Sequence, residues 1–262
     1  RPDSAGYYWV VATDGMCEAY AGVNIKEYDS LDQRANIWYF GNGAGIDFNP
    51  LPDDPPVAID GPLNTPEGTS VISDRNGQVI FSTDGSIVYD RLNQVISPPE
   101  GIGGNNTSTQ SALIIPVPGD ETLFYIFTTQ EVEGGTFELR YSLFDLKENN
   151  GLGALVTVNQ LLFKPSTERI TGDDNWLIAH EFGNNSFRAY PITPEGIGNP
   201  VISSIGSDHT TTNLANGQGY MKLGATNKLV VALSTPGVSN VVEIFDFIDS
   251  TGVVTNFRTA DL

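Results

Sequence analysis

The side chains of this sequence that could carry chemistry are few and scattered. The two histidines, His180 and His209, and the single cysteine, Cys17, stand far apart along the chain. A zinc site needs such residues a few positions apart, and an internal disulfide needs two cysteines. We therefore expect Cys17 to be a small buried apolar group, His180 to be a satisfied core or channel residue, and His209 to lie in an exposed loop, 207–217.

Carboxylates are plentiful, with 32 Asp and Glu in the chain. Glycoside hydrolysis requires two of them on opposite sides of a cleft. The candidates for such a pair are Asp47, Asp53, Asp54, Asp60, Glu67, Asp84, Glu168 and Glu181. Because chance pairs are expected among so many acids, a carbohydrate-active enzyme (glycosidase or lyase) with acids at a central channel is the alternative hypothesis and not the leading one.

The acids at 53–54, 173–174 and 246–249 could also offer oxygen atoms to calcium. None of these runs has the twelve-residue spacing of a calcium-binding loop, so we expect solvated turn acids. No Gly-rich loop opens a helix, and no Gly-x-Ser-x-Gly elbow is present. The sequence therefore assigns no catalytic residue, no metal ligand and no cofactor, and we expect no enzyme.

The overall charge excludes some partners. Only 13 Lys and Arg oppose the acids, which gives a net charge of −19. Such an excess repels phosphate backbones, so we expect no nucleic-acid partner. No apolar run reaches the roughly 18 residues that a membrane helix needs, so the chain is not expected to span a membrane. The 28 glycines and 16 prolines suit many strands and tight turns.

A repeat in the sequence indicates which secondary structure carries these residues. Residues 123–129 (LFYIFTT), 176–182 (WLIAHEF) and 229–235 (LVVALST) start 53 residues apart, and a second apolar strand follows each. A period of about 40–55 residues with several short strands is typical of a β-propeller, in which each repeat is one four-stranded antiparallel blade. We predict an all-β propeller with four blades, at 69–97, 111–158, 168–205 and 219–257.

The N-terminal residues fit the same pattern. The run 8–12 parallels 175–179, and 23–30 parallels 242–250. We therefore predict that residues 1–40 are the outer strands of a partial blade and that residues 41–262 form the propeller blades of a single domain. Because an open propeller leaves unpaired edges, and because the chain does not begin with Met, we expect this segment to belong to a larger propeller.

Several ordered motifs go beyond a general propeller pattern. They lie at 36–48, 64–68, 72–77, 106–111, 125–128, 139–142, 150–153, 167–168 and 176–190. In this order they resemble the N-terminal β-propeller family of large Bacteroidota surface proteins. That resemblance covers residues 36–262. The chain departs from it before Trp176 and at 224–227, where the family's usual turn sequences are replaced.

The resemblance implies a cellular role. In such proteins the propeller precedes PKD modules and a gliding-motility-associated C-terminal domain, which directs type IX secretion to the extracellular side or cell surface. Bacteroidota also attach O-glycans at Asp-Ser/Thr motifs, so Ser4, Ser30 and Ser250 are candidate O-glycosylation sites. The family carries no established catalytic residues that could be transferred to this chain.

These observations lead to one functional hypothesis. The chain is expected to be a non-enzymatic extracellular propeller module that acts in adhesion, partner binding or surface assembly. A protein or glycan partner would be held by propeller loops, because a rigid scaffold leaves its loops free to vary. The loops 48–66, 97–110 and 207–217 are the expected contact points, and incorporation into a larger assembly is the purely structural version of this role.

Overall fold

The chain is all-β, as the strand periodicity predicts. The computed structural model describes residues 6–13, 18–25, 33–49, 55–209, 214–235 and 239–261. Within these ranges the only helical segments are three single 3-10 turns, η1 (Val132–Gly134), η2 (Asn149–Gly151) and η3 (Leu214–Gly217). No helix in the described part of the chain is long and apolar enough to cross a membrane.

The described strands form one hairpin and five larger antiparallel sheets, which we number in chain order. The hairpin pairs β1 (Gly6–Thr13) with β2 (Glu18–Ile25). The first sheet contains β3 (Ile37–Tyr39), β4 (Ala44–Asp47) and β5 (Val57–Asp60), and the second contains β6 (Ser70–Ser73), β7 (Val79–Thr83) and β8 (Val88–Asp90).

The remaining sheets have more strands. The third contains β9 (Ala112–Pro116), β10 (Leu123–Thr129), β11 (Leu139–Asp145) and β12 (Ala154–Phe163). The fourth contains β13 (Ser166–Gly172), β14 (Trp176–Glu181), β15 (Ser186–Thr193) and β17 (Val201–Ser204), with the short β16 (Gly196–Ile197) on the end of β15. The fifth contains β18 (Met221–Leu223), β19 (Lys228–Thr235), β20 (Ser239–Ile248) and β21 (Val253–Asp261).

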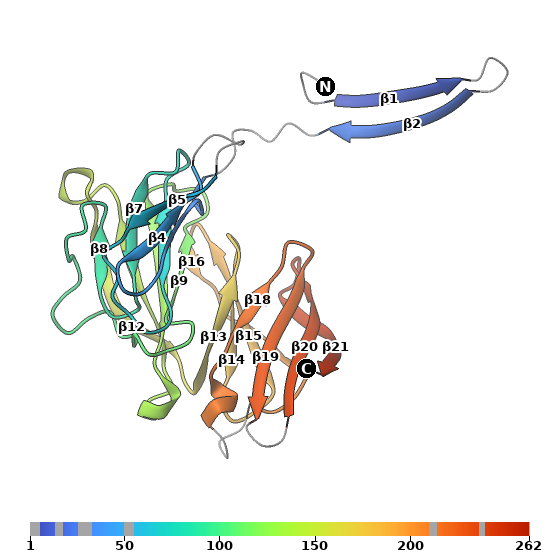
Figure 1. Ribbon diagram of the computed structural model, residues 1–262. Coiled ribbons are helices and arrows are strands. Elements are labelled where there is room, and N and C mark those ends of the chain that lie inside the picture. Colours follow the sequence, from blue (N-terminus) through green and yellow to red (C-terminus); the bar gives the residue numbers. More distant parts are fainter. Residues whose placement is uncertain are drawn as a thin grey trace.

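Each of the three repeated stretches is the second strand of its sheet, as β10, β14 and β19. The first strands β3, β6, β9, β13 and β18 contact one another in chain order. The five sheets thus stand next to one another, and the hairpin β1–β2 lies apart from them (Figure 1). Apolar side chains fill the space between each sheet and the next. For example, Tyr125 and Phe127 of β10 pack against Leu177 and Ala179 of β14.

Four separate cores lie between the five sheets. They join the first to the second sheet, the second to the third, the third to the fourth and the fourth to the fifth. Alternation within each strand produces this layering. In β14, Leu177 and Ala179 face the third sheet, while Trp176 and Ile178 face the fifth. A strand with both faces buried reads as a nearly continuous apolar run, which explains the sequence WLIA.

Two local expectations were wrong. Residues 48–66 were expected to form a loop, yet β5 lies within them and pairs with β4. The blade predicted at 69–97 was expected to have a fourth strand at its end, but after β8 only Val95 makes a bridge, to Tyr89. The chain turns sharply there because Asn93 has φ 61° and the Asp90 carboxylate accepts the N–H groups of Leu92 and Gln94.

The expected boundary at residue 40 runs through the first sheet. Strand β3 lies before this boundary and pairs with β4, which lies after it. Residues 37–39 therefore belong with the strands that follow them. The paired β1 and β2 agree with an extended conformation for the preceding residues, while residues 1–5, 14–17 and 26–32 lie outside the described part of the chain.

Candidate binding groove

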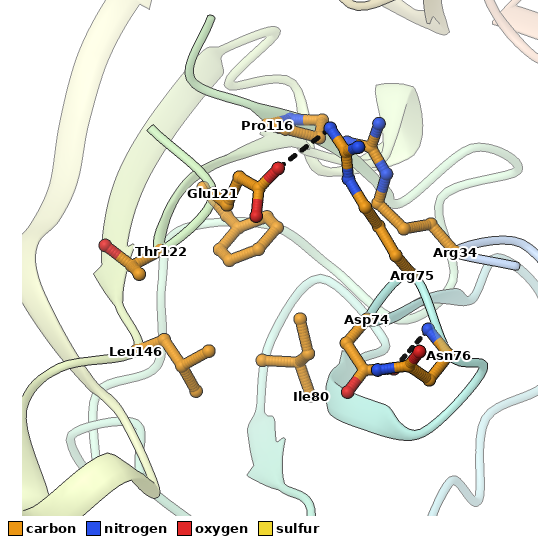
Figure 2. A pocket seen from close by; sticks show the side chains of 10 residues that line it. Arg34, Asp74, Arg75, Asn76, Ile80, Pro116, Glu121, Thr122 and Leu146 are labelled. Atoms are coloured by element: carbon orange, nitrogen blue, oxygen red, sulfur yellow. Dashed lines mark hydrogen bonds and ion pairs between the residues drawn. The ribbon is translucent and has the colours of Figure 1, made fainter. Parts of the chain in front are cut away.

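A cavity of about 470 Å³ opens where the first strands of the second and third sheets end (Figure 2). The β6–β7 turn contributes Asp74, Arg75 and Asn76, and the β9–β10 turn contributes Glu121 and Thr122. Arg34 reaches the same cavity from the segment before β3. In Figure 2 the Arg34 and Arg75 side chains lie next to each other at one end of the cavity.

Two further cavities continue from this one. They measure about 420 and 380 Å³, and both share Arg34 and Pro116 with the first. The one of about 420 Å³ extends between the first strands and is lined by Asp173, Asp174 and Lys222 among others. We call these three cavities together the central groove.

The central groove has a polar rim and an apolar floor. Pro116 of β9 and Leu146 after β11 are the partly exposed apolar residues that line the first cavity, with the buried Ile80 and Phe124 behind them, whereas the rim consists of charged and amide groups. Ligand sites in proteins commonly combine apolar walls with a few polar groups that fix orientation. Such a surface suits a sugar ring, which has an apolar face and hydroxyl groups at its edge.

The aspartates of the rim are structural. In the β6–β7 turn the Asp74 Oδ1 accepts the N–H of Asn76 at 2.8 Å, and in the β13–β14 turn the Asp173 Oδ1 accepts the N–H of Asn175 at 2.8 Å. Asp120 caps the β9–β10 turn in the same way, through the N–H of Thr122. These aspartate turns fix the backbone around the groove, and the second oxygen of Asp120 lies 3.5 Å from the Lys147 ammonium group.

A surface ion pair crosses the first cavity. The Arg75 guanidinium lies 2.8 Å from the Glu121 carboxylate, and these side chains are 58% and 73% exposed. An exposed pair of this kind contributes at most about 1 kcal/mol, because water and salt compete for both charges. A ligand can therefore exchange partners with Arg75 and Glu121 at small cost.

A second polar cluster lies between the fourth and fifth sheets and is closed to solvent. Its members are Arg169 of β13, His180 of β14, His209, and Glu243 of β20, each with no exposed surface. The Arg169 guanidinium donates to the carbonyls of Asn216, Gln218 and Ala232 and to His209 Nδ1. His209 was expected in an exposed loop. It is buried because its ring stacks on His180, with ring centroids 3.5 Å apart.

Burial controls the charges of this cluster. It holds the pKa of both His180 and His209 well below 6.5, and the nearby charge of Arg169 acts in the same direction. Burial also lowers the pKa of Arg169 to about 10, so its guanidinium remains charged at neutral pH. The cluster is thus one buried cation with two neutral imidazoles and the Glu243 carboxylate, and it has no opening to a substrate.

Two acidic residues show the raised pKa that the glycosidase hypothesis requires. Burial raises the pKa of Glu168, although its oxygens accept hydrogen bonds from Thr109 and Val132. Burial also raises the pKa of Glu67, as do the charges of Glu168 and Glu133. Glu168 is completely buried, whereas Glu67 is exposed beside a shallow cavity with Asn42 and Asn64.

The other candidate acids do not gather around one cavity. Asp84 is buried and its Oδ1 accepts the N–H groups of Ser86 and Ile87, and Glu181 pairs with Arg188 at 2.6 Å. Asp47 accepts the N–H of Asn49, and Asp60 ends β5. Asp53 and Asp54 lie outside the described residues. Within the described ranges, no three His, Cys, Asp or Glu side chains are placed to hold a metal ion.

The loops expected to meet a partner are largely engaged with one another. The Thr65 hydroxyl donates to the carbonyl of Asn106, and the Gln110 amide bonds to Met221 across the molecule. Thr109 donates its N–H and hydroxyl to Glu168, both at 2.7 Å. Because the strands are antiparallel, loops 97–110 and 207–217 lie at the end of the sheets opposite the central groove. The loop 48–66 instead begins beside the groove, where the Asn49 amide donates to the Gly77 carbonyl of the β6–β7 turn at 3.0 Å.

One of the candidate O-glycosylation sites can be located. Ser250 is exposed in the turn between β20 and β21, where a sugar would project into solvent. Ser4 and Ser30 lie outside the described residues. All three glycosylation assignments stay predictions.

One acid of the expected calcium candidates at 246–249 is engaged in ion pairs. Asp246 pairs with Lys228 and Arg258, and hydrogen bonds from Lys228, Asn256 and Arg258 lower its pKa to about 2.

Sequence reasoning overlooked the groove residues Arg34, Arg75 and Glu121. A signal was available, because an aspartate stands shortly before the second strand of three sheets, at Asp74, Asp120 and Asp173. Aligning these turns would have placed their neighbours at one end of the molecule. The fifth sheet lacks this aspartate and turns instead at 224–227, where Asn227 adopts φ 56°.

Comparison with known proteins gives no family. No protein-family profile matches the chain, and no curated protein matches its sequence. Among solved structures, the chain is similar to hydrazine synthase of Kuenenia stuttgartiensis, with 14% identity over 75% of this chain and 47% of that chain, and a TM-score of 0.37. It thus spans about half of the hydrazine synthase chain.

Two other solved structures are similar at a comparable level. A candidate 6-phosphogluconolactonase from Bacteroides uniformis has 10% identity over 98% of this chain and 83% of that chain, with a TM-score of 0.45. A hypothetical selenium-binding protein from Sulfolobus tokodaii has 10% identity over 98% of this chain and 74% of that chain, with a TM-score of 0.38. With TM-scores below 0.5, these likenesses assign neither a family nor an activity to the chain.

Proposed function

We propose that the five sheets are blades of a β-propeller and that the chain is a non-enzymatic, extracellular module of a secreted cell-surface protein. Three features support the propeller: the regular spacing of the three repeated stretches, the adjacency of the five first strands, and an apolar core between each sheet and the next. The sequence predicted four blades and a partial one. In this proposal each of the five sheets is one blade, and the hairpin β1–β2 is additional to them.

The observation that carries the binding role is the central groove. Its polar rim of Arg34, Arg75 and Glu121 stands over an apolar floor of Pro116 and Leu146. Neutral amides and charged groups around a floor of this kind favour a saccharide unit of a surface glycan. The groove therefore supports glycan adhesion at the end of the molecule opposite the loops 97–110 and 207–217.

Titration with neutral and uronic-acid oligosaccharides, followed by amide chemical shifts, tests this proposal. We expect shifts confined to the β6–β7 and β9–β10 turns, and at least a tenfold loss of affinity in Arg75→Glu. Arg91→Glu is the matched control, because Arg91 is an exposed arginine that bonds to the Gly151 carbonyl outside the groove. Binding that is equally strong in both variants would contradict the groove assignment.

The alternative function, a carbohydrate-active enzyme, is favoured by the raised pKa of Glu67 and Glu168. In this role Glu67 would be the proton donor, because it is the exposed member of the pair. Turnover of an oligosaccharide that disappears in Glu67→Gln and persists in Arg75→Glu would establish the enzyme and refute the adhesion role.

A further inference from the structure

The first sheet carries an apolar face that the described residues leave open. Ile37 and Tyr39 of β3 pack toward the second sheet, so the alternate residues point the other way. On that side Trp38 is 51% exposed, Phe40 is 41% exposed and Phe48 is 38% exposed. We call this surface the outer face of the first sheet.

The strand register makes the outer face continuous. Trp38 pairs with Ile46, and Ile46 pairs with Ala58, so one row of side chains crosses all three strands. The rings of Trp38 and Phe48 lie 4.9 Å apart and form one aromatic patch. Large aromatic groups gathered on one face are far less common on a free surface than single exposed apolar residues.

Wherever two of the described sheets are consecutive, each covers the apolar face of the other. Four apolar cores fill the spaces from the first to the fifth sheet. The outer face of the first sheet has the same composition as the faces within those cores. The fitting cover is therefore another strand pair with an apolar face.

The hairpin β1–β2 has the composition of such a cover. Its strands read GYYWVVAT and EAYAGVNI, so apolar and aromatic residues predominate in both. A two-stranded hairpin alone is marginally stable in water and needs a surface to pack against. Its sequence also parallels that of strands in the other sheets, since 8–12 resembles 175–179 at the start of β14 and 23–30 resembles 242–250 in and after β20.

The length of the connection fits this arrangement. Residues 26–36 connect β2 to β3. Among the connections between neighbouring sheets, the one from β12 to β13 (164–165) is shorter, and the one from β8 to β9 (91–111) is longer. The hairpin is thus tethered to the first sheet by a linker of the size that joins neighbouring sheets, which gives it a high effective concentration at the outer face.

Figure 1 shows the hairpin β1–β2 standing apart from the first sheet. We propose that it folds back and packs on the outer face of the first sheet, over Trp38 and Phe48, as strands of a preceding blade. The partner of this surface is therefore a segment of the same chain. The proposal is independent of what the central groove binds.

Amide hydrogen exchange of the full chain tests the docking, because exchange reports the stability of each hydrogen-bonded segment. We expect the amides of β1 and β2 to be protected in the unmodified chain. The double variant Trp38→Ser, Phe48→Ser should speed their exchange at least tenfold. The double variant Leu92→Ser, Val95→Ser is the matched control, because it removes two exposed apolar side chains from the segment after β8 and should leave the hairpin unchanged.

Exchange in β10 shows whether a variant has lost overall stability. If β10 also exchanges faster, the single change Phe48→Ser replaces the double variant and should still affect only the hairpin. Rapid exchange of β1 and β2 in the unmodified chain would overturn the proposal. Hairpin protection that depends on protein concentration would also overturn the proposal, because that result would assign the outer face to a second copy of the chain.

Discussion

Gly151 and Gly153 both lie in the turn that leads into β12, and both have φ of +85°. Only glycine adopts this region without strain, so an added Cβ is unfavourable at either site. Their surroundings differ. A Cβ on Gly151 would meet nothing within 4 Å, whereas a Cβ on Gly153 would overlap the Phe144 ring, which belongs to the core between the second and third sheets.

This pair separates backbone strain from overpacking. We expect Gly151→Ala to lower the free energy of unfolding by about 1 kcal/mol, through its φ alone. Gly153→Ala should lower it by about 2–4 kcal/mol, because the Phe144 ring must also move and overpacking adds roughly 1–3 kcal/mol. Urea unfolding of both variants measures the difference. Equal losses would show that the Phe144 ring yields freely.

Among the elements, the second strand of each of the last three sheets was the most predictable. The stretches 123–129, 176–182 and 229–235 match β10, β14 and β19 to within one residue at either end. Both faces of these strands are buried, so their apolar runs are long enough to recognise. Strand β5 was missed because VAID is short, follows two prolines and has little buried surface.

The candidate site was less predictable for a related reason. Groove residues such as Arg75 and Glu121 stand in turns, where no periodicity marks them. Their proximity depends on strands that are far apart in the sequence. The negative assignments for metal ligands and cofactors stay predictions. The burial of His209 depends on a contact with His180, which lies in another part of the sequence, so no local pattern reveals it.

The aspartate turns allow a prediction at the level of one element. Asp173→Ala removes the acceptor for the N–H groups of Asn175 and Trp176, at 2.8 and 2.9 Å. Losing these charge-assisted bonds should lower the free energy of unfolding by about 1–2 kcal/mol. Asp174→Ala, at the next position, is the control and should have an effect within about 0.5 kcal/mol. Thermal or urea unfolding distinguishes the two, and equal effects would refute the capping role.

At the level of the whole molecule, charge is arranged in two ways. The net charge of −19 is spread over an exposed surface, whereas the cluster of Arg169, His180, His209 and Glu243 is sealed between the fourth and fifth sheets. Arg169 of β13 bonds to the Ala232 carbonyl of β19 at 2.9 Å, so the cluster ties these sheets together. Its stability therefore depends on the two imidazoles remaining neutral.

The depressed histidine pKa values predict a loss of stability in weak acid. The unfolded chain takes up protons at both histidines near pH 6.5, whereas the folded chain does not until the pH falls well below that value. The free energy of unfolding should therefore decrease as the pH falls below 6.5, with a slope that approaches about 1.4 kcal/mol per pH unit for each histidine.

Urea unfolding between pH 6.5 and 5.5 measures this slope before most carboxylates titrate. His180→Phe should reduce the slope, because one of the two imidazoles is then absent. A variant with the slope of the unmodified chain would show that His180 does not contribute to the acid sensitivity.

The separation of the apolar interior into four distinct cores has a mechanical consequence. Load applied through the two ends of the chain would reach one boundary at a time, since no single core joins all five sheets. A pulled molecule should lengthen in discrete steps, each the length of one sheet with its connection. A protein built in this way absorbs tension by releasing one unit while the others remain folded. Single-molecule extension records would display this as a sawtooth of regular spacing.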